Sequence, residues 1–233
     1  MSEVEPKVWP MPDIVLIAHG SPDPRYAADV ELLADAVRDR VRRGRAVGTC
    51  FLNYSPSPDE IAAELRRRAV AVPILLSPEK PGAPTLPGAV RRLASHGTIV
   101  RLAPGLGPDG RLIDACEELL VRAGVAPDKS TGVLVLVAHS DEVNAVDRML
   151  RGAPRRRWGG WAVAALDEPD AVEEATARLR ESVSDVVGVP FTMARCLDRD
   201  HMAVRCASLG VRLMPGSLAQ TSALADLVVA RTG

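Results

Sequence analysis

The chain has 233 residues, of which 25% are charged, and its formal net charge at pH 7 is −1. A net charge so close to zero provides no field that would attract nucleic acid, and no apolar run reaches the roughly 18 residues that a membrane span requires. We therefore expect a cytoplasmic protein that has neither a nucleic-acid nor a membrane partner.

The first half of the sequence alternates short apolar runs with segments of helical periodicity. The run at residues 13–18 is apolar throughout after its first residue, which is typical of a strand buried on both faces. The further predicted strands of this half are residues 47–52, 70–76 and 98–102, and its predicted helices are residues 27–41, 58–68, 89–95 and 110–123. Alternation of this kind favours a parallel sheet with right-handed crossovers.

The second half repeats motifs of the first half in the same order. Residues 14–21 (IVLIAHGS) return as 133–140 (VLVLVAHS), residues 70–73 (VAVP) return as 187–190 (VGVP), and residues 101–105 (RLAPG) return as 212–216 (RLMPG). The two copies of each motif lie about half the chain apart, which is typical of a duplicated structural unit.

A polar, turn-rich stretch at residues 126–132 is the predicted linker between the two copies. After it, the predicted strands are residues 133–138, 161–166, 186–190 and 211–214, and the predicted helices are residues 142–150, 170–182, 199–208 and 218–230. The chain is therefore predicted to form two similar α/β lobes, at residues 1–127 and 128–233, whose parallel sheets face a central cleft.

One histidine follows the first predicted strand in each of the two copies. Ligands of parallel α/β sheets bind beyond the carboxyl ends of the strands, and a neutral imidazole there can bind a metal or accept a proton. His19 holds this place in the first half, and His139 holds the equivalent place in the second. The alternative is a structural histidine that bonds a neighbouring loop.

A third histidine, His201, lies inside a predicted helix beside Asp198 and Asp200. Oxygen and nitrogen ligands in such a cluster suit a divalent metal. The same pattern is equally typical of an acidic helix start that complements the helix dipole.

Four segments of the first half form an ordered set of motifs. They are residues 16–25 (LIAHGSPDPR), 51–57 (FLNYSPS), 72–78 (VPILLSP) and 102–109 (LAPGLGPD). In this order and spacing they resemble the HGSRDPR turn, the FLE-x-x-x-PS segment, the VPLFLSPG strand end and the APPLGPDP turn of the class II tetrapyrrole chelatases, the sirohydrochlorin cobalt- and ferrochelatase family.

The resemblance implies insertion of a divalent metal into a sirohydrochlorin-like tetrapyrrole by a monomer or homodimer. Cobalt and iron are the expected metals, with nickel as a further option; the metal is a substrate, and no organic cofactor is expected. His19 matches the family histidine that serves as base or metal ligand. Ser21, Arg25 and Lys80 are the expected substrate contacts, because this substrate carries many carboxylates.

The sequence departs from the family pattern at two places. The family has a second histidine after the third strand, in a G-x-H-x-x-x-D-I-P pattern, where this chain has Pro81. An acidic residue of the FLE segment is also missing, since this chain has Asn53 and Ser55 there. Proline can neither bind a metal nor move a proton, so His19 alone remains of the usual set.

Three interpretations follow. In the first, the site is rebuilt: Glu79 acts in catalysis and as a metal ligand with His19. The second lobe contributes further ligands from His139, Glu168, Asp198 or His201. In the second, the protein binds a tetrapyrrole or a metal without turnover. In the third, Ser21 or Ser140 beside a histidine acts in a hydrolase, although the sequence lacks the GxSxG motif.

Overall fold

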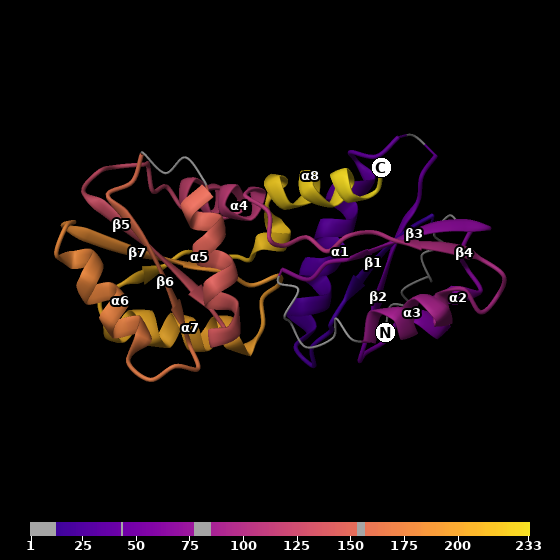
Figure 1. Ribbon diagram of the computed structural model, residues 1–233, viewed down its shortest axis with the longest axis horizontal. Coiled ribbons are helices and arrows are strands. Elements are labelled where there is room, and N and C mark those ends of the chain that lie inside the picture. The colour runs from indigo at the N-terminus through magenta and orange to yellow at the C-terminus, as the bar shows by residue number, and fades with distance from the viewer. Residues whose placement is uncertain (1–12, 43, 77–84, 153–156) are drawn as a thin grey trace, which may run out of the picture.

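The computed structural model describes residues 13–42, 44–76, 85–152 and 157–233 (Figure 1). It confirms two α/β lobes, each built on a four-stranded parallel sheet. The first sheet has the order β2-β1-β3-β4, with β1 at Ile14–Ala18, β2 at Val47–Phe51, β3 at Arg68–Pro73 and β4 at Ile99–Leu102. The second repeats this order as β6-β5-β7-β8, with β5 at Thr131–Val137, β6 at Gly160–Ala165, β7 at Asp185–Pro190 and β8 at Arg212–Leu213.

Helices follow the strands in both lobes. They are α1 (Pro24–Arg38), α2 (Pro58–Ala62), α3 (Leu86–Leu93), α4 (Arg111–Arg122), α5 (Val143–Gly152), α6 (Ala171–Arg180), α7 (Leu197–Ser208) and α8 (Ser222–Arg231), with short 3-10 turns at Ser140–Glu142 and Leu218–Gln220. In the described parts of the chain, no helix combines the length and the apolar character needed to cross a bilayer.

Several predicted boundaries differ from the structure, among them the following three. Helix α1 begins three residues earlier than predicted, because Asp23 caps it and Pro24 suits its first turn. Helix α2 ends at Ala62, six residues before its predicted end, and Arg68, the last residue predicted to be helical, begins β3. The end of the predicted linker belongs to β5, which begins at Thr131. The division of the sequence at residues 127 and 128 stays a prediction.

The core follows from alternation along the buried strands. Ile14 and Leu16 of β1 belong to the same hydrophobic cluster as Val133 and Val135 of β5, so one central core is shared by both lobes. The opposite face of β1 packs with α2 and α3, and the opposite face of β5 packs with α6 and α7. Each central strand is therefore covered on both sides.

The last helix of each half crosses to the other half. Helix α4 follows the first sheet in the sequence but packs against β7, and α8 follows the second sheet but packs against α1 and α4 (Figure 1). The two halves are therefore held together by exchanged helices as well as by the shared core.

Candidate functional site

A cleft of about 230 Å³ lies where the two sheets present the carboxyl ends of their strands to each other. Its lining comes from the ends of β1, β3, β5 and β7 and from the beginnings of α1 and α7: His19, Gly20, Ser21, Tyr26, Ile74, Leu75, Leu76, Ala138, His139, Thr192, Met193, Ala194, Cys196 and Asp198. The strand-end rule thus found the right edge of each sheet. The lining combines an apolar floor with two imidazoles, one from each lobe.

The ring of His19 is held through both of its nitrogens. Nδ1 lies 3.2 Å from the carbonyl oxygen of Gly20, and Nε2 lies 3.2 Å from Nδ2 of Asn53. Because a carbonyl can only accept, we assign the proton of the neutral ring to Nδ1, which leaves the Nε2 lone pair to accept from the Asn53 amide. Nε2 is therefore the atom that can bind a metal or take a proton.

The turn after His19 depends on a glycine. Gly20 has a φ of +92°, and a Cβ added there would lie 2.5 Å from Cδ2 of Tyr54. Tyr26, the third residue of α1, lines the cleft beside His19 and Gly20. Burial raises the pKa of its hydroxyl to about 12. The hydroxyl therefore stays protonated at neutral pH, and the turn that carries His19 is closely packed from two sides.

His139 reaches the same cleft, but it is not the register equivalent of His19. Pro73 pairs with Ile17 and Pro190 pairs with Leu136, so the sheets align Ile17 with Leu136 and hence His19 with Ala138. His139 stands one residue further along the chain. The prediction that His139 holds the place equivalent to His19 was therefore wrong by one residue, whereas the ungapped repeat of residues 14–21 as 133–140 agrees with the register of the sheets.

The contact partner of His139 is a carboxylate rather than an amide. Its Nδ1 lies 3.4 Å from Oδ2 of Asp167, the residue that follows β6 as Asn53 follows β2. Both side chains of this pair are exposed, at 53% and 43%. The two imidazoles of the cleft thus have chemically different partners.

Thr192 is a lining residue that the sequence did not single out. It is only 6% exposed, and its hydroxyl oxygen has no hydrogen-bond partner. The backbone amides of Ile74 and Phe191 make equivalent hydrogen bonds, to Ile17 and Leu136 of the neighbouring strands. The residue after Ile74, Leu75, is therefore the counterpart of Thr192 in the first lobe. An apolar side chain thus suffices at this position for folding, and nothing in the sequence marked the hydroxyl.

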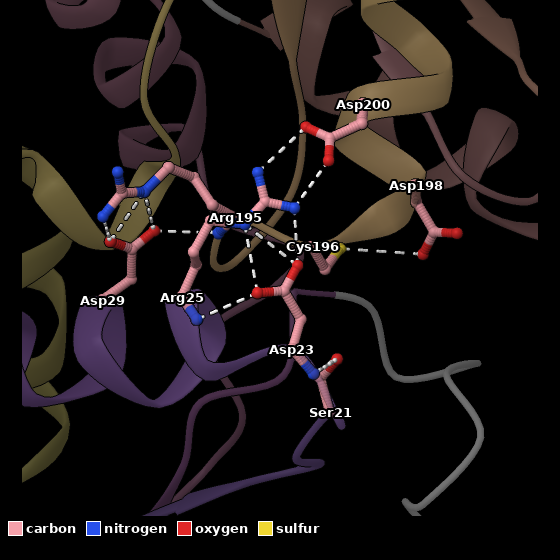
Figure 2. Close-up of polar contacts among 8 residues, drawn as sticks. All are labelled: Ser21, Asp23, Arg25, Asp29, Arg195, Cys196, Asp198 and Asp200. Atoms are coloured by element: carbon pink, nitrogen blue, oxygen red, sulfur yellow. Dashed lines mark hydrogen bonds and ion pairs between the residues drawn. The ribbon is translucent and has the colours of Figure 1, made fainter.

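Arg25, which the sequence predicted as a substrate contact, and Arg195 are both engaged with carboxylates (Figure 2). Arg25 forms ion pairs with Asp23 at 2.6 Å and with Asp200 at 2.5 Å. These two carboxylates raise the pKa of Arg25, Asp23 having the larger effect, and Arg25 in turn lowers the pKa of Asp200. Arg195 pairs with Asp29 at 2.7 Å. In the described structure, neither guanidinium faces the cleft without a partner.

Asp29 is the centre of a second group of polar contacts between the lobes. It is fully buried in α1 and accepts bonds from the side chain and backbone of Arg195, from Ser217 and from Gln220. Burial alone would raise the pKa of this carboxyl, but these donors, Arg195 foremost, hold it below its usual value. The group fixes the loop that leads into α7 against α1.

His201 does not reach the cleft. It lies one turn beyond Asp198 on α7 and lines a separate surface hollow with Asp167, Glu168 and Asp170. Within the described residues, no group of three or more His, Cys, Asp or Glu side chains is arranged to hold a metal ion. The set of His19, His139 and His201 is therefore not brought together, because helix α7 extends His201 past the end of the cleft.

Two predicted site residues, Glu79 and Lys80, lie outside the described residues, as does Pro81. Ser21 lines the cleft, and its hydroxyl accepts a bond from the backbone of Asp23 at 3.2 Å. Since both ring nitrogens of His19 contact Gly20 and Asn53, no serine–histidine pair of the hydrolase type forms there.

Comparisons with known proteins match part of the chain to a family and both lobes to a known fold. Residues 13–123 match the CbiX family. One similar structure is a multi-domain protein of Deinococcus radiodurans, described as structurally similar to chelatases with two additional domains. It is 19% identical with a TM-score of 0.76, and the match covers 96% of this chain and 55% of the Deinococcus chain. This chain thus spans about half the length of that protein.

Two further structures match over nearly their whole length. SirB from Bacillus subtilis, determined with Fe3+, is 16% identical with a TM-score of 0.68, over 94% of this chain and 92% of its own. CbiX, described as the terminal enzyme of siroheme biosynthesis in denitrifying bacteria, is 17% identical with a TM-score of 0.67, over 95% of this chain and all of its own. At these identities the structures show the fold. No curated protein sequence matches the chain significantly.

Proposed function

We propose that this chain, which matches the CbiX family over residues 13–123 and has a chelatase-like fold across both lobes, inserts a divalent metal into a sirohydrochlorin-like tetrapyrrole. Iron and cobalt are the proposed metals, with nickel as a further option. The metal is a substrate here, and one chain contains both imidazoles of the cleft, so a monomer is sufficient for the reaction.

The observation that carries the proposal is the pair of imidazoles in one apolar cleft. Insertion of a divalent metal replaces two pyrrole N–H protons, so two protons must leave as the metal enters. His19 and His139 can each accept one of them at Nε2. The apolar floor, which includes Ile74 and Met193, suits the face of a macrocycle.

The two histidines are suited to different parts of this reaction. The partners of His19 are neutral, so the Asn53 amide can leave Nε2 when a metal approaches, and His19 is assigned as metal ligand and base. His139, whose Nδ1 lies 3.4 Å from Oδ2 of Asp167, is assigned as the second proton acceptor. Glu79 remains the proposed auxiliary ligand, since it follows the cleft-lining Leu76 by three residues.

The second candidate function is binding of a tetrapyrrole or a metal without turnover. The presence of Asn53 where related sequences have a carboxylate favours it, because an amide gives His19 no help in holding a cation. In this case the cleft would bind the ring without speeding metal insertion.

The test is anaerobic incubation of the purified protein with sirohydrochlorin and Fe2+, Co2+ or Ni2+, followed by visible absorbance against a protein-free control. His19→Ala is expected to slow insertion by about 100-fold or more, the usual loss on removing a general base. His96→Ala is the matched control, because His96 is an exposed histidine that contacts Ser95 outside the cleft.

The outcomes separate the candidates. Wild-type insertion faster than the protein-free rate, lost in His19→Ala and kept in His96→Ala, supports the chelatase. A spectral shift on ring binding without faster insertion identifies the binding protein. Full insertion activity in His19→Ala contradicts the assignment of His19.

A further inference from the structure

We propose that Arg25 is a preformed receptor for a carboxylate of the ligand and that Asp200 occupies this receptor when no ligand is bound. The inference rests on the proposed function for the identity of the ligand, a macrocycle with peripheral carboxylates. It assigns to Asp200, on the second lobe, the role of an internal competitor that sets which rings bind well.

Arg25 is held in place from within its own lobe. Asp23 accepts from Nε of Arg25 at 3.0 Å and from Nη2 at 2.6 Å, and only 9% of the Asp23 side chain is exposed. Asp23 is itself fixed, because it caps α1 by accepting from the backbone of Arg25 at 2.9 Å. The plane of the guanidinium is therefore set before any contact with the second lobe.

The end of the guanidinium faces Asp200 in the geometry used for carboxylate recognition (Figure 2). Nη1 donates to Oδ1 at 3.2 Å and Nη2 donates to Oδ2 at 2.5 Å, two parallel bonds from one fork to one carboxylate. Both side chains are 40% exposed. A pair this exposed contributes little to stability, so a carboxylate from outside can replace Asp200 at small cost.

The position of the pair suits a ring that is larger than the cleft. Ser21 and Asp198 line the cleft. The Arg25–Asp200 pair is linked to both of them: the backbone amide of Asp23, the partner of Arg25, donates to the Ser21 hydroxyl, and Asp200 follows Asp198 by two residues. A tetrapyrrole seated against the apolar floor must extend past these residues, so its peripheral carboxylates reach the level of Arg25.

Arg195 lacks the features of such a receptor. Its partner Asp29 is completely buried and accepts further bonds from Ser217 and Gln220. Separating that pair would leave a charge buried without a partner, which is strongly destabilising. Of these two arginines, only Arg25 can exchange one carboxylate for another without disturbing the core.

The test measures binding of uroporphyrin, a metal-free ring with eight carboxylates, by absorbance titration of wild type, Asp200→Asn, Arg25→Gln and the double variant. Asp200→Asn is expected to bind about two- to fivefold more tightly, which corresponds to an exposed ion pair of up to about 1 kcal/mol. The gain is expected to disappear in the Arg25→Gln background. A general effect of removing one negative charge would persist there.

Asp226→Asn is the matched control, because Asp226 forms an exposed ion pair with Arg40 between the two halves, at α8 rather than α7. It is expected to bind uroporphyrin as wild type does. An unchanged or weaker affinity in Asp200→Asn, a gain that survives in the double variant, or no uroporphyrin binding in any variant would overturn the inference. Metal insertion into sirohydrochlorin is measured separately, so failure of the proposed function appears in that assay alone.

Discussion

Asp29 shows how a single buried residue joins the two lobes. Its carboxylate lies in α1 of the first lobe, and its hydrogen-bond donors come from the second, at residues 195, 217 and 220. The exposed fraction of its side chain is 0%, so the charge depends completely on these donors. A buried carboxylate with this many donors stabilises the fold only while it is ionised.

Asp29→Asn is therefore expected to lower the free energy of unfolding by about 3 kcal/mol at pH 7, the cost of breaking a buried ion pair. Because the pKa of Asp29 is lowered in the folded protein, its contribution is present above the ordinary value of about 3.9 and is lost as the pH falls through the folded value. The difference between wild type and variant should shrink below about pH 4.

Urea unfolding at a series of pH values measures this difference. Asp226→Asn, at the 63% exposed partner of Arg40, should cost less than about 1 kcal/mol at any of them. A loss of equal size in both variants would contradict the special role of Asp29.

At the scale of an element, the turn between β1 and α1 controls how His19 is presented. Gly20 adopts a left-handed φ of +92°, which favours glycine, and its Cα approaches Tyr54 so closely that a Cβ would fall 2.5 Å from Cδ2. The same turn supplies the carbonyl that fixes Nδ1 of His19. The conformation of one glycine thus determines the direction of the Nε2 lone pair of His19.

Gly20→Ala is expected to lower the free energy of unfolding by about 2 kcal/mol, from backbone strain together with displacement of Tyr54. Gly97→Ala separates the two causes, since Gly97 has a φ of +84° with no atom within 4 Å of an added Cβ. That variant should lose only about 1 kcal/mol. If thermal or urea unfolding shows the same loss of free energy of unfolding in both variants, the contact with Tyr54 does not contribute to the effect of Gly20→Ala.

At the scale of the whole molecule, the exchanged helices and the common core predict that the lobes unfold as one unit. Helix α8 packs against α1 and α4, and its buried Leu227 belongs to the cluster that also contains Ile14 of β1 and Val133 of β5. A cavity in this helix should therefore weaken both sheets, although α8 follows only the second in the sequence.

Leu227→Ala is expected to destabilise the protein by about 2–5 kcal/mol, the usual cost of removing a fully buried leucine. Native-state hydrogen exchange should then show lower protection in both β1 and β5, by similar factors. Val204→Ala, at a 71% exposed position of α7, should leave protection unchanged. Loss of protection confined to one sheet would show that the lobes open separately.

Much of the architecture could be predicted because the buried strands are continuously apolar and are separated by helical periodicity. The strands of both sheets lie close to their predicted places, and the strand-end rule located the cleft and two of its histidines. Helix starts were less predictable where capping decided them, as at Asp23 and Pro24. The motifs of residues 13–123 were specific enough to indicate the family.

The sequence alone determined that the chain repeats an α/β unit, that His19 and His139 end strands, and that the first half is related to chelatases. Only the tertiary structure decided that His139 enters the same cleft as His19, that His201 does not enter it, and that Arg25 is paired with a carboxylate 175 residues away. The reason is physical. Local sequence fixes the conformation of each segment, whereas the packing of two sheets and their exchanged helices fixes which distant side chains meet.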